Sequence, residues 1–157
     1  MSFNLDGQPP PAPGPGCPMD CTVSTLGSRA AMLVLRQAFY GDRRFEAFVQ
    51  HTGISEATIA KRLHELVGAG VLTRRPYQEP GARVRHEYEL TPAGEELLPV
   101  IIGLFEWGRR HLAESQADLE LVGPDGRRVD VAIQSSTGER LNARQIQIRP
   151  SEEPTVL

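Results

Sequence analysis

The 157-residue sequence lacks the features that mark membrane-spanning and secreted proteins. Its two cysteines are too few for a disulfide framework, and no apolar run approaches the ~18 residues that a membrane-spanning helix requires. The N-terminus has no basic region followed by an apolar stretch, so we expect no signal peptide. These absences predict a soluble, cytoplasmic protein that does not associate with membranes.

The chain also lacks the usual signs of an enzyme. It contains no phosphate-binding loop, no nucleophile and base at a recognisable spacing, and no metal-ligand cluster. Its four histidines occur singly, as surface or helix-capping histidines do: His51, His64, His86 and His111. We therefore expect no catalysis, no cofactor and no bound metal.

Positive charge is limited overall and unevenly distributed. The net charge of −3 taken alone disfavours nucleic-acid binding. Between Arg29 and Arg85, however, ten Arg and Lys residues accompany five Asp and Glu residues, which gives a net charge of +5. From His86 onward, seven basic residues accompany thirteen acidic ones. A basic first half and an acidic second half are expected if one surface meets phosphates.

The basic half is organised around residues 54–70. Apolar residues recur there at helical spacing and would form one buried stripe: Ile59, Leu63, Leu66 and Val67. Ser55 is placed to cap the start of this helix, and Gly70 can adopt the left-handed conformation that ends one. The opposite face is small and polar at first and cationic one turn later.

A shorter apolar-periodic segment, residues 45–52, precedes this helix, and Gly53 supplies the turn between the two. Phe45, Phe48 and Val49 would face inward. A short helix, a tight turn and a longer helix match a helix-turn-helix, whose second helix enters the major groove of DNA. From these two helices alone, an ordinary helical hairpin in a globular core fits the pattern equally well.

The sequence that follows separates these two interpretations. Strand-type residues on both sides of a Pro80-Gly81 bend predict a β-hairpin: Val71, Tyr77, Val84, Tyr88 and Leu90. Its arms and loop carry four arginines: Arg74, Arg75, Arg83 and Arg85. A helix-turn-helix followed by a basic hairpin is the winged-helix arrangement, in which the wing offers guanidinium groups to phosphates or to the minor groove. We therefore expect the protein to bind double-stranded DNA.

Nine side chains are the predicted DNA contacts. The second helix of the motif supplies base or adjacent phosphate contacts and groove-edge contacts: Ser55, Glu56, Thr58, Lys61 and Arg62. The wing supplies Arg83 and Arg85. The segment before the motif supplies Arg43 and Arg44 as clamps on the phosphate backbone, although solvated surface charges would give the same pattern.

The N-terminal segment carries both cysteines. Residues 1–16 are rich in Pro and Gly and are expected to form a disordered tail. Cys17 and Pro18 would cap and begin a short helix that ends near Thr25. A thiol at a helix N-terminus lies near partial positive charge and can be reactive, so Cys17 and Cys21 are the candidates for a redox response. Small, half-buried thiols without chemistry fit the same pattern, and an intact helix holds this pair too far apart for good disulfide geometry.

Two longer helices would hold the domain together. Residues 28–40 are apolar over most of the helix circumference, as expected for the centre of a small bundle. A second helix, residues 91–111, would be kinked at Pro99. It is apolar on two sides, so we expect one side to pack on its own domain and the other on a second copy of the chain. Phe105 and Trp107 would then be placed to contact a small-molecule effector, unless the C-terminal tail covers this face.

Residues 116–150 differ in character from the rest. Alternating apolar residues and two turn sequences predict three short strands in a small C-terminal β-appendix. Residues 17–115 would form the DNA-binding and dimerisation domain, and residues 151–157 should be loose. The predicted fold class is therefore mainly α with a β-wing, a winged helix-turn-helix, plus this appendix.

A series of short motifs along the chain follows the pattern of one family: Cys17-Pro18, Leu26-Gly27, Arg43-Arg44-Phe45, Gly53-Ile54-Ser55, Ala69-Gly70, Leu90-Thr91, Pro99 and Trp107. Over roughly residues 17–111 the chain resembles the HxlR-type winged-helix transcriptional regulators. The resemblance implies a dimeric DNA-binding regulator with N- and C-terminal helices at the dimer interface. It also implies that Cys17 corresponds to a cysteine that senses oxidants or electrophiles in some members. Ser28-Arg29-Ala30 replaces the family's frequent Gly-Lys-Trp, and the β-appendix lies outside the family core.

Together these observations predict a sequence-specific transcriptional regulator that responds to redox conditions or to a small molecule. Its homodimer would place the second helix of each helix-turn-helix, residues 54–70, in successive major grooves of a near-palindromic operator. The alternative is a winged-helix protein-interaction module that no longer binds DNA, with the acidic β-appendix as its working surface.

Overall fold

The computed structural model describes residues 16–112 and 120–146. The chain divides into two compact units, one within residues 15–120 and the other containing residues 121–157, and each is described by itself. The predicted tail and the predicted loose C-terminus fall outside the described residues. Within the described ranges, no helix has the length and apolar character needed to cross a membrane.

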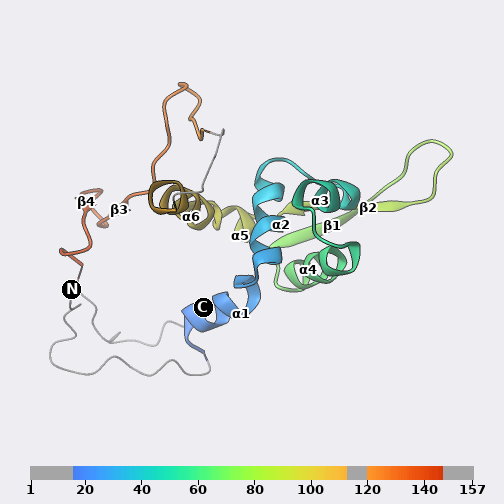
Figure 1. Cartoon of the computed structure of the whole chain (residues 1–157), viewed down its shortest axis with the longest axis horizontal. Coiled ribbons are helices and arrows are strands. Elements are labelled where there is room, and N and C mark those ends of the chain that lie inside the picture. The colour runs from blue at the N-terminus through green and yellow to red at the C-terminus, as the bar shows by residue number, and fades with distance from the viewer. Residues whose placement is uncertain (1–15, 113–119, 147–157) are drawn as a thin grey trace. The chain divides into compact units, whose positions relative to one another are not determined.

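The first unit is built from helices and one β-hairpin (Figure 1). Its elements in chain order are α1 (Pro18–Leu26), α2 (Arg29–Phe39), α3 (Phe45–Thr52), α4 (Glu56–Gly68), β1 (Leu72–Tyr77), β2 (Arg85–Leu90), α5 (Pro92–Glu95) and α6 (Leu98–His111). In Figure 1, α2 lies between α5 and α6 on one side and the pair α3 and α4 with the hairpin on the other. This arrangement confirms the predicted winged helix-turn-helix, with α4 as its second helix and the hairpin as its wing.

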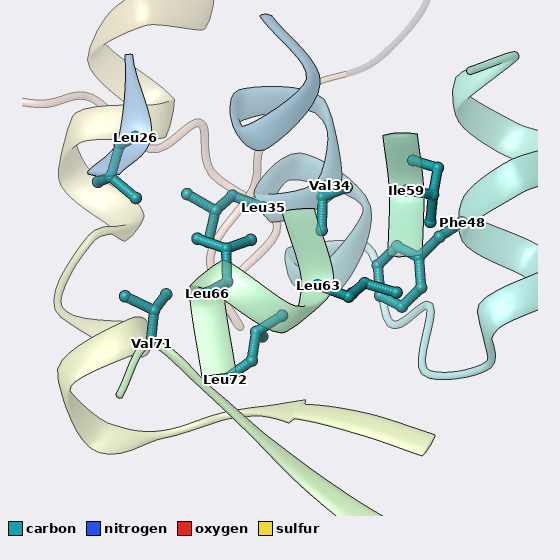
Figure 2. Packing of buried hydrophobic residues seen from close by; sticks show 9 residues of the cluster. All are labelled: Leu26, Val34, Leu35, Phe48, Ile59, Leu63, Leu66, Val71 and Leu72. Atoms are coloured by element: carbon teal, nitrogen blue, oxygen red, sulfur yellow. The ribbon is translucent and has the colours of Figure 1, made fainter. Parts of the chain in front are cut away.

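Buried hydrophobic side chains from α2, α3, α4 and β1 form one cluster (Figure 2). The predicted stripe on α4 is confirmed, because Ile59, Leu63 and Leu66 are fully buried. Phe48 of α3 is also fully buried, and its ring packs edge-to-face with the Tyr88 ring at a centroid distance of 6.3 Å. Side chains packed at this density fix the angle between two helices. The core therefore sets the positions of α4 and the wing.

Two glycines end the helices of the motif as the sequence predicted. Gly53 after α3 has φ +65°, and Gly70 after α4 has φ +71°, both in the left-handed region that costs glycine little. The predicted cap at the start of α4 was wrong in its bonding. Ser55 occupies the N-cap position, but its hydroxyl contacts Thr58 Oγ1 at 2.9 Å and no backbone amide.

The wing is an antiparallel hairpin whose register runs from Leu72 opposite Leu90 to Tyr77 opposite Arg85. The segment between α2 and α3 is hydrogen-bonded to β2 of this hairpin. The Tyr88 amide donates to the Arg43 carbonyl at 2.8 Å, and Arg44 forms an isolated β-bridge with Glu87. The base of the wing is thus hydrogen-bonded to the segment that leads into the helix-turn-helix.

Residues 91–111 form two helices, and the prediction of one kinked helix was wrong. Thr91 caps α5, because its hydroxyl accepts from the Gly94 amide at 3.1 Å. α5 ends at Glu95, and Glu96 and Leu97 form a turn whose dihedral angles stay in the right-handed helical region, before α6 begins at Leu98 with Pro99 in its first turn. A proline in the first turn removes no intrahelical hydrogen bond, whereas the same proline in a helix interior would remove one.

The second unit has less strand than the alternating sequence predicted. In residues 120–146, β3 (Ile133–Gln134) pairs antiparallel with β4 (Arg140–Leu141), and Val122 forms an isolated bridge with Arg128. The third expected strand covered residues 144–149. Residues 144–146 lie in a turn and a bend that follow β4, and residues 147–149 lie outside the described ranges.

Candidate nucleic-acid interface

The exposed side of α4 lies opposite its buried stripe and forms the candidate surface for the major groove. Five residues recur along it at helical spacing: Glu56, Ala57, Ala60, Lys61 and His64. Alanine side chains permit close approach of a duplex and suit contact with thymine methyl groups. Glu56 and Lys61 are among the contacts predicted from the sequence, whereas Ala57, Ala60 and His64 are not. Counting about two residues, or half a helical turn, from the buried stripe would have found Ala57 and His64, and the three- and four-residue spacing from these two gives Ala60.

Arg62 lies at the edge of this surface. Its side chain is 23% exposed, and its guanidinium donates to Glu65 on the same helix. The Nε atom of Arg62 is buried and has no hydrogen-bond partner among the described residues. Lys61, by contrast, is 65% exposed, and its Nζ lies 4.0 Å from Glu65. Lys61 is therefore better placed than Arg62 to reach a base edge or a phosphate.

The two arginines that precede α3 are held by acids of the wing. Arg43 pairs with Glu89, which also accepts from Arg75 Nε at 2.9 Å. Arg44 pairs with Glu79 at 2.9 Å, and its guanidinium carbon lies 4.7 Å from the centroid of the Tyr77 ring. The side chains of Arg43 and Arg44 are still 58% and 54% exposed. Both can meet a phosphate, but only in exchange for a carboxylate.

Two other wing cations are turned toward α3 or toward a neighbouring side chain. Arg85 donates to Glu46 Oε1 at 2.9 Å, and Arg74 Nη2 lies 2.8 Å from Nδ1 of His86. Arg83 is exposed in the loop that joins β1 to β2. In the part of the chain that the structure describes, no acid pairs with Arg83. Of the predicted wing contacts, Arg83 is thus the one whose charge is not already partly neutralised.

Exposed apolar side chains occur on α1 and α6. On α1 they are Met19 and Val23, and on α6 and just after it they are Leu98, Val100, Leu104, Trp107 and Leu112. Trp107 is 54% exposed and lies against the ring of His111. Phe105 is half-buried, and because residues two apart on a helix do not face each other, Phe105 and Trp107 do not lie on one face of α6.

Cys17 and Cys21 are both free thiols at the start of α1. Cys17 is half-buried at the N-cap, and Cys21 is exposed. The Cys21 amide donates to the Cys17 carbonyl at 2.9 Å, so an intact helical turn separates the two residues. A disulfide between them within one chain would require this turn to open, as their spacing in the sequence predicts.

Comparison with known proteins agrees with this geometry. The model of the HxlR-like helix-turn-helix family matches residues 25–116. The chain belongs to this family. It is 40% identical over 90 residues to the uncharacterized HTH-type transcriptional regulator Mb3122 of Mycobacterium bovis, with 57% of this chain and 56% of that protein covered. It is 33% identical over 111 residues to a regulator of Synechocystis, sll1512, with 70% and 81% covered. The chain thus spans about half the length of the first relative. Both relatives are named as HTH-type transcriptional regulators and not as enzymes.

Solved structures add a likeness that reaches beyond the family core. The proposed transcription factor PA1607 superposes with a TM-score of 0.75 at 29% identity, covering 88% of this chain and 96% of that one. PA1374 from Pseudomonas aeruginosa gives 0.62 at 28%, covering 88% and 95%. The reduced redox regulator HypR gives 0.55 at 26%, covering 63% and 99%. Residues 1–120 make up about three quarters of this chain. A match over 88% therefore extends into the C-terminal segment, which PA1607 and PA1374 share at least in part.

Proposed function

We propose that this HxlR-like protein is a transcriptional regulator that binds double-stranded DNA as a homodimer on a near-palindromic operator. The observation that carries the proposal is the exposed face of α4, where Ala57, Ala60 and Lys61 lie opposite a fully packed stripe. This face would enter the major groove, and Arg83 of the wing would contact phosphates or the minor groove. Family membership and the regulators named among the relatives support the same function.

The dimer is inferred from apolar surface. Met19 of α1 is 71% exposed, and Leu104 and Trp107 of α6 are 53% and 54% exposed. Large apolar side chains grouped on a surface mark interaction sites more often than isolated ones do. A second copy of the chain that covers α1 and α6 would place two α4 helices on one duplex. Their separation would match about one helical turn of DNA, roughly 34 Å.

A redox response is the second part of the proposal, and it rests on the exposed, free thiol of Cys21 and the half-buried thiol of Cys17. HypR has been solved in reduced and oxidized forms, and YodB of Bacillus subtilis has been solved reduced and after diamide treatment. We extend a thiol response to this chain because α1 carries both cysteines and is proposed to lie in the dimer interface. A link between the Cys17 or Cys21 thiols of two subunits would alter that interface directly. A small molecule bound between the α6 helices near Trp107 would act on the same interface.

The test is DNA binding by the full chain, measured by fluorescence anisotropy at moderate salt. One duplex carries the region upstream of the chain's own gene, and the other has the same length and a random sequence. We expect tighter binding to the upstream duplex, with two chains bound per duplex at saturation. Weak and equal binding to both would contradict the proposal and favour the protein-interaction alternative.

The redox part has its own test. Binding is measured again after mild oxidation, with the state of each thiol determined by mass spectrometry. We expect oxidation to change the affinity for the upstream duplex, and replacement of Cys17 and Cys21 by Ser to abolish that change. Unchanged affinity with both thiols modified would contradict a redox response and leave DNA binding untouched.

A further inference from the structure

A pocket of about 340 Å³ lies between the first turn of α3 and the wing. Its lining combines two aromatic residues with four side chains that carry charge or hydrogen-bonding groups: Phe45, Tyr88, Glu46, Arg74, Arg85 and His86. Glu46 supplies the only carboxylate among these residues. The two guanidinium groups outnumber it, so the pocket carries a net positive charge with an apolar wall beside it.

Hydrogen-bond donors converge on this pocket from three side chains. Arg74 Nη2 lies 2.8 Å from Nδ1 of His86. Because a guanidinium can only donate, Nδ1 must accept in this contact, which leaves the Nε2–H of His86 as a donor. Arg85 has one N–H engaged with Glu46 Oε1 at 2.9 Å and keeps further N–H groups in its fork. Two arginine forks and an imidazole N–H match the acceptors of a phosphate group.

The Glu46 carboxylate pairs with the Arg85 guanidinium, and a phosphate could take the place of that carboxylate. The side chains of Glu46 and Arg85 are 61% and 60% exposed, and ion pairs at such exposure hold their partners weakly. Glu46 also lies in the first turn of α3, whose N-cap Arg44 gives no side-chain cap. Negative charge is favoured near a helix N-terminus. The carboxylate therefore stands where a phosphate oxygen would be bound.

We propose that this pocket binds one phosphate group, and that Glu46 holds Arg85 in the free protein until the phosphate takes its place. Two sources share this chemistry: a phosphodiester of the DNA backbone and a free phosphorylated small molecule. The first source rests on the proposed DNA binding, and the second does not. In either case Arg74, His86 and Glu46 join the functional surface, and none of the three is among the nine DNA contacts predicted from the sequence.

The first experiment observes the pocket directly by NMR on the labelled full chain. A random duplex is titrated in one arm, and inorganic phosphate is titrated in the other against chloride at constant ionic strength. We expect the His86 imidazole and the Arg85 Nε–H signals to shift in at least one arm, with little change at Arg75, which pairs with Glu89 instead. A shift with duplex alone identifies the DNA backbone as the source. A shift with inorganic phosphate identifies a free phosphate group.

If neither the His86 nor the Arg85 signals shift in either arm, the proposal that the pocket binds phosphate is overturned. The failure of DNA binding is distinguishable from this result. If the duplex shifts the α4 signals while the His86 signals do not shift in either arm, the result supports DNA binding and contradicts phosphate binding in the pocket. If the duplex shifts no signal but inorganic phosphate shifts His86, the pocket stands and the DNA proposal falls.

The second experiment tests the exchange at Glu46. Glu46→Gln should tighten binding of the identified source about two- to fivefold, the range expected for release of an exposed ion pair. The same substitution in an Arg85→Gln background should have a smaller effect, because the competition for Arg85 is already removed and only the repulsion between the Glu46 carboxylate and the phosphate remains. Glu87→Gln is the matched control, since it removes one negative charge from the residue next to His86 without lining the pocket. Equal gains in affinity from Glu46→Gln and Glu87→Gln would show that only the overall charge of the surface matters. That result would overturn the proposed exchange of the Glu46 carboxylate for a phosphate at Arg85.

Discussion

The guanidinium of Arg62 donates to Glu65 three residues further along α4, and only 23% of the Arg62 side chain is exposed. Its neighbour Lys61 is 65% exposed and lies at 4.0 Å from the same carboxylate. The two cations are adjacent in sequence, but their side chains have different roles. Arg62 covers the flank of α4 with its stem, whereas Lys61 offers its charge to solvent.

Replacement of these two residues should therefore give different results. Lys61→Ala should weaken binding to any duplex and lower the magnitude of the salt slope by about one unit, as loss of one phosphate contact does. Arg62→Ala should change the salt slope less and lower the melting temperature more, because it removes packed methylene groups and frees Glu65. Anisotropy over a salt series and thermal unfolding measure the two effects. A loss for Arg62→Ala that is much greater on operator than on random DNA would show that Arg62 contacts bases.

The helices of the motif could be predicted from sequence because their burial follows their own periodicity. The residues of α3 match the predicted range 45–52, and α4 has the predicted stripe with a left-handed Gly70 after it. The break before Pro99 was missed for a physical reason. A proline within an apolar periodic segment is compatible with a kink or with the start of a new helix. The choice between them depends on how α5 and α6 pack.

The ion pairs that join the wing to the segment around the start of α3 could not be predicted from sequence, unlike the i,i+3 and i,i+4 pairs of Arg62 and Lys61 with Glu65 within α4. Glu46 and Arg85 are separated by 39 residues, and Arg43 and Glu89 by 46. Such pairs form only because β2 is hydrogen-bonded to the segment before α3, which is a property of the folded sheet. The sequence pattern therefore indicates which residues are basic, and the fold decides which of them are already paired.

Arg83 is exposed in the loop at the tip of the wing, so its substitution tests directly whether the wing contacts DNA. Arg83→Ala should weaken binding to upstream and random duplexes by similar factors and lower the magnitude of the salt slope by about one unit. Arg29, which is exposed at the start of α2, provides a control with the same charge loss. An Arg83→Ala slope equal to that of the wild type would remove Arg83 from the DNA-binding surface.

The packing of Phe48 makes it the side chain on which α3 depends. It is fully buried, it belongs to the core cluster, and its ring contacts the edge of Tyr88 in the wing. Phe48→Ala should lower the free energy of unfolding by about 3–5 kcal/mol, a large part of the total for a domain of this size. Urea denaturation measures the loss. Phe45→Ala, at a partly buried neighbour, should cost less, and an equal cost would contradict the central place given to Phe48.

Position 94 requires glycine because the backbone of Val71 leaves no room for a side chain there. A Cβ atom at this position would lie 2.2 Å from the Val71 carbonyl oxygen, which already accepts from the Thr91 amide at 3.1 Å. Gly94→Ala should therefore push α5 away from β1 and cost about 1–3 kcal/mol, as overpacking does. Gly68→Ala in α4 meets nothing within 4 Å. That control should be neutral or slightly stabilising, and equal melting temperatures for the two variants would contradict the steric argument.

The proposed dimer can be separated from DNA contact by placing one charge at two equally exposed apolar residues. Leu104 of α6 is 53% exposed, and Val84 beside the wing tip is 56% exposed. Leu104→Glu would bury a carboxylate in the α6 interface, which is costly without a partner, so we expect a monomer by light scattering at micromolar concentration. Val84→Glu should remain a dimer but bind duplexes more weakly, because the new carboxylate faces phosphates next to Arg83. A dimeric Leu104→Glu variant would place the dimer contact elsewhere than on this face of α6, since a buried, unpaired carboxylate cannot be accommodated without loss of association.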